Sequence, residues 1–160
     1  MEIVERSLIG ELPPDCDSGI KTAHGYWEAI KPSPELLPGR QHFDPTEIPE
    51  VLPYIWLIDV TRAPLRFRWR LLGSWHAAAM NGNHVGRWID EVVPDFQSGP
   101  LYPQYLNVVE RRTIAFRAGR SLMRKDRDFV VVERLIMPLA ADGQTVDMIM
   151  GVSAFPGRLR

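Results

Sequence analysis

The sequence has one cysteine, Cys16, and only three lysines among its 19 basic residues. A single cysteine excludes an internal disulfide and a cysteine-cluster metal site, and a free thiol is typical of a reducing compartment. No apolar run approaches the roughly 18 residues of a membrane-spanning helix. The N-terminus lacks a basic leader followed by an apolar segment, so it does not resemble a secretory signal. We therefore expect a cytoplasmic protein with no membrane partner.

What is present indicates one globular domain. The chain has 160 residues, of which 45% are hydrophobic and 24% are charged, and a chain of this length suits a single core. Residues 20–31 have a helical apolar stripe that ends at the prolines that follow. Asp44, Pro45 and Glu47 have the arrangement of a helix start, with Asp44 as N-cap. An apolar run then indicates a strand at 55–62.

The clearest pattern is the strict alternation of residues 65–71, LRFRWRL. It predicts a strand with one apolar face and one arginine face, formed by Arg66, Arg68 and Arg70. Ala63 and Pro64 suit the tight connection of a hairpin with residues 55–62. Ser74 can cap a short helix, and residues 101–113 predict a longer one.

Three strands are predicted at 114–123, 128–139 and 145–155, the last two joined by a turn at 141–143. Strands come first and last with helices between them, which favours an α+β fold with a five-stranded antiparallel sheet. Residues 128–139 are apolar in both phases, so this strand is central and both of its faces are covered. The helix at 20–31, or a second subunit, is the natural cover of the second face.

Four sequence blocks carry a family resemblance: FDPTEIPEVLPYIWLIDV, LRFRWRLLGS, HVGRWIDEVVPD and VVVERLIMPLAADGQTVDMIMGV. Together, in this order and spacing, they resemble the motifs of a PAS-like family of short alphaproteobacterial proteins. The bulky residues after Ser74 depart from that family, which has smaller ones there. The resemblance implies an N-terminal extension at 1–19, a PAS-like domain at 20–156 with helices on one face of the sheet, and a tail at 157–160.

The resemblance implies a sensor or binding module, usually without its own output domain, and not an enzyme. Its ligand pocket would lie between the helices and the sheet. The residues that would line it are Trp75, His76, Met80, Trp88, Tyr105, Phe116, Arg134 and Met148. The alternative is a pure dimerisation or interaction module, in which these side chains fill the core without a void.

The sequence does not identify a cofactor. Haem would need an apolar pocket around a ligating histidine, and residues 101–113, which supply that histidine in haem-binding PAS proteins, have none. Cys16 lies outside the PAS-like region, which disfavours cysteine-dependent flavin and hydroxycinnamate chemistry. The histidines lack metal-site spacing. A small isomerase or hydrolase would need an inward-facing Asp59 or Asp147 as base.

Two charged features call for a partner. Glu133 and Arg134 lie in the most apolar strand, where neighbours point to opposite faces and a buried charge needs a counter-charge. Arg134 either pairs with an acid of the N-terminal third or binds an anionic ligand. Residues 111–128 hold seven bases against two acids, but no nucleic-acid reader motif is present. The partners we expect are a small molecule, a second copy of the chain or a signalling protein.

The charges are also distributed unevenly. Residues 1–61 carry 11 acids and 4 bases, whereas residues 62–160 carry 9 acids and 15 bases. The simplest expectation is that the acidic N-terminal segment lies across the outer arginine face of residues 66–70, or makes a dimer contact there.

Overall fold

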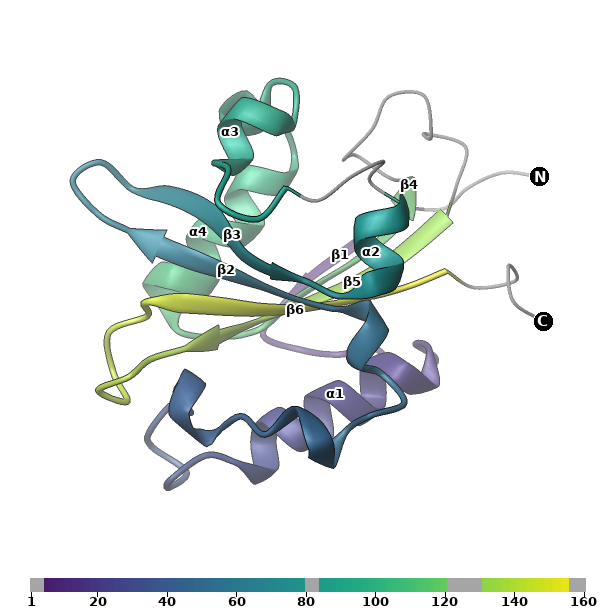
Figure 1. The fold of residues 1–160 in the computed structure, drawn as a ribbon, viewed down its shortest axis with the longest axis vertical. Helices are drawn as coiled ribbons and strands as arrows, with labels where there is room; N and C mark the ends of the chain where they lie inside the picture. Colours follow the sequence, from purple (N-terminus) through teal and green to yellow (C-terminus); the bar gives the residue numbers. More distant parts are fainter. Residues whose placement is uncertain (1–4, 80–83, 121–130, 156–160) are drawn as a thin grey trace.

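The computed structural model describes residues 5–79, 84–120 and 131–155. A six-stranded antiparallel sheet forms its centre, with the strands in the order β1–β4–β5–β6–β2–β3 (Figure 1). The strands are β1 (Arg6–Ile9), β2 (Ile55–Thr61), β3 (Arg66–Leu72), β4 (Ala115–Arg120), β5 (Val131–Leu139) and β6 (Met148–Ala154).

Helices lie on both sides of this sheet. They are α1 (Ser18–Ala29), α2 (Ser74–Ala79), α3 (Ile89–Val92) and α4 (Leu101–Arg111). In Figure 1, α1 lies on one side of the sheet, and α3 and α4 lie on the other. Short 3₁₀ turns at Arg40–His42, Pro45–Glu47, Leu52–Tyr54 and Phe96–Ser98 connect the elements. The predicted α+β class with an antiparallel sheet is therefore confirmed.

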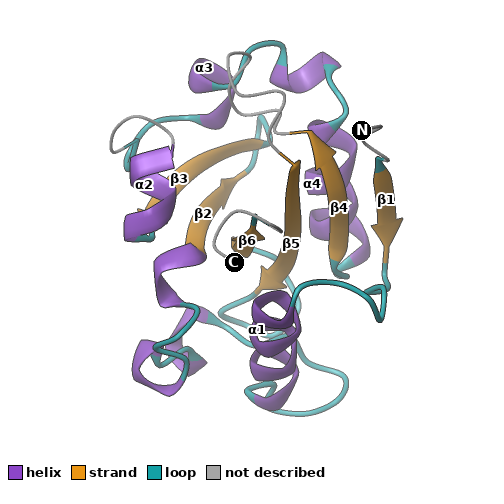
Figure 2. Cartoon of the chain, turned by 90° about the vertical axis from the view of Figure 1, so that its right-hand side faces the viewer, coloured by secondary structure: helices purple, strands orange, loops and turns teal. Residues whose placement is uncertain are grey.

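The sheet has one strand more than the five that the sequence predicts. Residues 6–9 form β1, which pairs with the edge of β4 from Arg6 opposite Ala118 to Ile9 opposite Ala115. Figure 2 shows β1, β4 and β5 side by side. Four residues are too few to give a clear alternation, and the strand exists because β4 offers it an open edge. The N-terminal segment thus extends the sheet before α1 begins.

The helix α1 covers the second face of β5 and β6, as the two-sided apolarity of residues 128–139 predicts. Asp17 caps the helix by accepting a hydrogen bond from the Gly19 N–H at 2.8 Å. Its buried stripe, Ile20, Ala23 and Trp27, recurs every three to four residues, which places these side chains on one helix face. The Trp27 indole N–H donates to the buried Pro138 carbonyl at 2.9 Å, which fixes the helix against β5.

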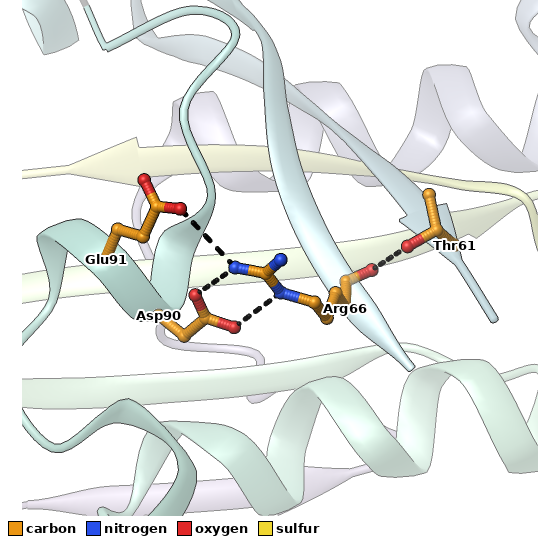
Figure 3. Close-up of polar contacts among 4 residues, drawn as sticks. All are labelled: Thr61, Arg66, Asp90 and Glu91. Carbon is orange, nitrogen blue, oxygen red and sulfur yellow. Dashed lines mark hydrogen bonds and ion pairs between the residues drawn. The ribbon is translucent and has the colours of Figure 1, made fainter. Parts of the chain in front are cut away.

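The arginine face of β3 has different partners from those expected. Arg66 pairs with Asp90 at 2.7 Å and with Glu91 at 3.6 Å, both in α3 (Figure 3). Arg70 lies 3.7 Å from Asp59 of the neighbouring strand β2. The expectation that the acidic N-terminal segment lies across this face is wrong. That segment pairs at the opposite edge of the sheet instead, because β1 is added to β4.

The alternation of residues 65–71 holds through Trp69 and then breaks. Phe67 and Trp69 are buried, whereas Leu71 is 37% exposed. The pairing of β2 with β3 shifts between Leu57 and Ile58, and such a bulge turns the following side chains to the other face.

Among the described residues, no helix is long and apolar enough to cross a membrane.

Candidate functional site beneath helix α4

A row of polar side chains crosses the apolar sheet at the middle of β5. Arg134 stands opposite Arg117 of β4 on one side and opposite Ser153 of β6 on the other. Directly paired residues point to the same face of a sheet. All three are buried, with exposed fractions of 5%, 4% and 3%. Polar groups at such positions require partners, so this row is the most unusual feature of the core.

Helix α4 lies over this row. Its buried positions are Leu101, Gln104, Tyr105, Val108 and Val109, a spacing that gathers them on one face. The Gln104 side-chain amide donates to the Phe116 carbonyl of β4 at 3.3 Å, which fixes the helix on the sheet. Tyr105, one position further, is 1% exposed and lies beneath the helix among Phe67, Phe96 and the buried row.

Tyr105 and Arg134 influence each other's ionisation directly. Burial raises the pKa of the Tyr105 hydroxyl to about 12, and the nearby Arg134 charge opposes that rise. Burial also lowers the pKa of Arg134, with Tyr105 opposing the fall. The two side chains are close enough for a weak polar contact, but within the described part of the chain neither Tyr105 Oη nor Arg134 Nη1 makes a well-aligned hydrogen bond. The phenol and the guanidinium are therefore close, but each keeps unused hydrogen-bonding capacity.

Arg117 has the counter-charge that Arg134 lacks. Its Nη2 lies 3.4 Å from Glu5 Oε2, and its Nη1 donates to the Arg120 carbonyl at 3.0 Å. Burial and the Arg134 charge lower the pKa of Arg117, whereas Glu5 raises it. We name Tyr105, Arg117 and Arg134 the buried arginine cluster. It contains two buried cations, and Glu5 is the one acid in a salt bridge with them among the described residues.

Glu133 points the other way, as expected for neighbours on a strand. Its Oε1 accepts a hydrogen bond from the Asp17 N–H at 3.0 Å, where α1 begins. Burial raises the pKa of Glu133, and this hydrogen bond opposes the rise. The expected salt bridge between Arg134 and an N-terminal acid is not found among the described residues. The ion pair with an N-terminal acid is made by Arg117, which the sequence marked only as one of the seven bases of residues 111–128.

The predicted pocket residues do not line one common pocket but lie in different parts of the structure. Trp75 of α2 packs on Phe155, with ring centroids 3.9 Å apart, and on Tyr54 at 5.9 Å. Trp88 lies at the free edge of β3, where the Arg66 and Arg68 guanidinium carbons are 4.0 Å and 5.0 Å from its ring. None of these four ring contacts involves a residue of the row formed by Arg117, Arg134 and Ser153.

The remaining predicted pocket residues are also separated. Phe116 alternates with Arg117 and thus faces the α1 side of the sheet, where the Arg6 guanidinium carbon lies 5.9 Å from its ring. Met148 is the half-buried first residue of β6. His76 falls within α2, but its side chain lies outside the described part of the structure, and so does Met80. Of the predicted set, the structure brings Tyr105 and Arg134 together.

A surface cavity of about 590 Å³ lies elsewhere. We name it the α1 cleft; the residues that define it here are Leu12, Lys21, His24, Lys31, Arg111 and Arg112. A second groove of about 400 Å³ runs between Phe43, Leu52 and Leu71. None of the predicted pocket residues whose side chains the structure describes lines either cavity. Among the described residues, no group of histidine, cysteine and acidic side chains could hold a metal ion.

The two aspartates considered as catalytic bases have structural contacts. Asp59 lies 3.7 Å from Arg70, and Asp147 Oδ2 accepts a hydrogen bond from the Ala141 N–H at 3.2 Å in the turn before β6. The sequence places both residues on strands, which is right for Asp59 in β2 and wrong for Asp147, which lies one residue before β6.

Comparison with known families gives the class of the protein. Residues 17–154 match the PAS domain family, and this range contains the whole sheet except β1. The chain therefore belongs to the PAS domain family, a group of domains that generally act as sensing or interaction modules. Neither the curated proteins nor the solved structures contain a significant match to it.

Proposed function

We propose that this PAS domain senses a small molecule that binds between α4 and the sheet and contacts Tyr105 and Arg134. The observation that supports this is the unused hydrogen-bonding capacity of two groups buried to 1% and 5% exposure. An unsatisfied buried polar group costs about 1–3 kcal/mol. A ligand that supplies the missing partner would recover that free energy, so such a pair indicates a site that is complete only when it is occupied.

We further propose that the site binds and does not catalyse. Asp59 and Asp147, the residues that would serve as bases, are engaged in an ion pair and in a turn. A sensor instead needs a ligand whose affinity differs between two states of the protein. The N-terminal segment is the element suited to respond, because Glu5 reaches the cluster from just before β1.

Native mass spectrometry of freshly purified protein tests the proposal. We expect the wild type to retain a small molecule, and the Tyr105→Phe and Arg134→Lys variants to retain less of it. Tyr26→Phe is the matched control, because Tyr26 lies in α1, on the other side of the sheet from α4, and its hydroxyl contacts Asp44. A wild type that retains nothing, and whose unfolding midpoint responds to no compound in a screen of metabolites, would refute ligand sensing. A dimer in the same spectrum would then support the alternative of a pure interaction module.

A further inference from the structure

The buried arginine cluster has an uneven charge balance. Arg117 and Arg134 are direct cross-strand partners on one face of the sheet, and like charges in that arrangement repel. Both side chains are at most 5% exposed, so water screens the repulsion poorly. The Glu5 carboxylate, at 51% exposure, pairs with Arg117, and the described residues give it no ion pair with Arg134. In the described part of the chain, the two buried cations thus have one half-exposed acid as a counter-charge.

The unused hydrogen bonds belong to Arg134 and Tyr105, and not to Arg117, the arginine that Glu5 contacts. Arg117 has its contacts with Glu5 and with the Arg120 carbonyl, whereas Arg134 Nη1 and Tyr105 Oη have none among the described residues. A guanidinium is a fork of donors that suits the oxygen atoms of a carboxylate or a phosphate, and a phenol O–H can add a further donor. A compact anion would satisfy both groups at once.

We infer that the ligand of this site is a compact oxyanion that binds Arg134 and Tyr105 and competes with Glu5 for Arg117. This inference rests on the proposed function and names its ligand class. A second negative charge beside the two arginines weakens the pull of Arg117 on Glu5. The Glu5 side chain packs on Gly119, where an added Cβ would lie 2.8 Å from Glu5 Cγ. When Glu5 is released from Arg117, its close packing on Gly119 at the start of β1 is therefore lost as well.

The competition for Arg117 would let ligand binding at the buried arginine cluster change the stability of β1. The strand β1 has four residues at the edge of the sheet, and short edge elements open at low free-energy cost. Its pairing with β4 begins at Arg6 opposite Ala118, one residue after Glu5. Loss of the Glu5–Arg117 contact on ligand binding would loosen β1 from its first residue, while the core strands stay protected.

Thermal unfolding with sodium phosphate or sodium acetate, against sodium chloride at equal ionic strength, tests the inference. We expect at least one oxyanion to raise the wild-type midpoint beyond chloride, since a ligand that binds the native state stabilises it. The shift should disappear in Arg134→Met and weaken in Tyr105→Phe. Glu5→Gln removes the competing charge. The apparent dissociation constant of the oxyanion should therefore be at least threefold lower in this variant than in the wild type.

Two further measurements separate the site from other sources of anion binding. Lys21→Gln alters the α1 cleft and should keep the wild-type response, whereas loss of the response in that variant would overturn the inference. Hydrogen exchange of residues 6–9 should speed up with the oxyanion in the wild type but not in Glu5→Gln. Should Arg134→Met fail to fold, Arg134→Lys and Glu5→Gln still decide the outcome.

The results also distinguish this inference from the proposed function. Equal oxyanion shifts in the wild type and Arg134→Met, or a Glu5→Gln variant that binds no more tightly, would overturn the inference. A neutral molecule retained in native mass spectrometry, with no oxyanion response, would refute the ligand class and leave ligand sensing standing. Absence of both a retained molecule and an oxyanion response would refute the two together.

Discussion

Arg66 and Asp90 form a two-point ion pair between β3 and α3. Arg66 Nε donates to Asp90 Oδ2 at 2.9 Å, and Nη2 donates to Oδ1 at 2.7 Å (Figure 3). The Arg66 guanidinium carbon also lies 4.0 Å from the centre of the Trp88 ring, and Trp88 forms a bridge with Arg68 at the free edge of β3. The pair therefore fastens a segment over an edge strand that would otherwise be open to another chain.

The first prediction concerns the ionisation of Asp90. The hydrogen bonds from Arg66 lower the pKa of this carboxyl, so its contribution to stability is present above its unfolded pKa of about 3.9 and is lost as the pH falls through its lower folded value. In Arg66→Gln, we expect the Asp90 pKa to rise toward its ordinary value. An NMR pH titration of the Asp90 carboxyl measures it in both proteins.

Asp142 provides the matched control for that titration. Its pKa is lowered by hydrogen bonds from the Gln144 and Thr145 N–H groups, which Arg66→Gln leaves in place. We expect the Asp142 titration to be the same in both proteins. An Asp90 pKa that is unchanged in Arg66→Gln would show that the ion pair does not hold in solution.

The sequence predicted the parts of the fold that depend on local periodicity. The alternation of LRFRWRL marked β3, and the two-sided apolarity of residues 128–139 marked a central strand with a covered second face. The cap at Asp44 was also predicted, and its Oδ1 accepts from the Thr46 N–H at 3.0 Å, although the element is a single 3₁₀ turn. Each of these features is determined by neighbours within a few residues.

The features that the sequence did not predict depend on contacts between distant residues. The strand β1 forms because β4 offers it an edge, and that pairing joins residues more than 100 positions apart. Glu5 and Arg117 meet through the same pairing. Arg134 was predicted as a buried charge with an N-terminal acid or an anion as partner. The choice between them depends on which strand edge the N-terminus joins, and no local pattern encodes that.

The second prediction tests the contact that fixes α1 on the sheet. Trp27 is 3% exposed, and its indole N–H is bonded to the Pro138 carbonyl. Trp27→Phe keeps an aromatic ring but leaves that carbonyl without its donor, which should cost about 1–3 kcal/mol of unfolding free energy. Trp27→Ala also creates a cavity and should cost about 3–5 kcal/mol. Urea unfolding followed by circular dichroism measures both.

Tyr26→Phe is the control for the loss of one hydrogen-bonding group from α1. The Tyr26 hydroxyl accepts from the Asp44 N–H at 2.7 Å at an exposed site, where water can replace the lost contact. Its unfolding free energy should fall less than that of Trp27→Phe. The opposite order would show that the Trp27–Pro138 hydrogen bond does not hold α1 in place.

The third prediction compares two glycines. Gly151 of β6 stands opposite Trp56 of β2, and an added Cβ would lie 2.2 Å from Trp56 ring atoms. Because Trp56 is fully buried, its ring has no space to move into, and Gly151→Ala should cost about 3 kcal/mol. Gly25 of α1 has no atom within 4 Å of such a Cβ, so Gly25→Ala should stabilise the helix by about 0.5–1 kcal/mol. Urea unfolding of both variants measures these changes. Equal changes in unfolding free energy would contradict the close packing of Trp56 on Gly151.

The last prediction tests the buried hydroxyl at the centre of the candidate site. The Tyr105 pKa of about 12 exceeds the ordinary tyrosine value of about 10. The native state therefore holds this proton more tightly than the unfolded state does. Its contribution to stability is complete below pH 10 and should fall between pH 10 and 12 by about 1.4 kcal/mol per unit.

Two alkaline measurements check this ionisation. In an absorbance titration at a wavelength specific for tyrosinate, the ionisation step at the highest pH should be absent from Tyr105→Phe. The decline of the unfolding free energy above pH 10 should also be shallower in that variant. Arg134→Met removes the cation that opposes the rise, so the Tyr105 step should move to still higher pH in that variant. A step that stays in place, or moves to lower pH, would mean that Arg134 does not face the phenol, and the buried arginine cluster would lose its link to α4.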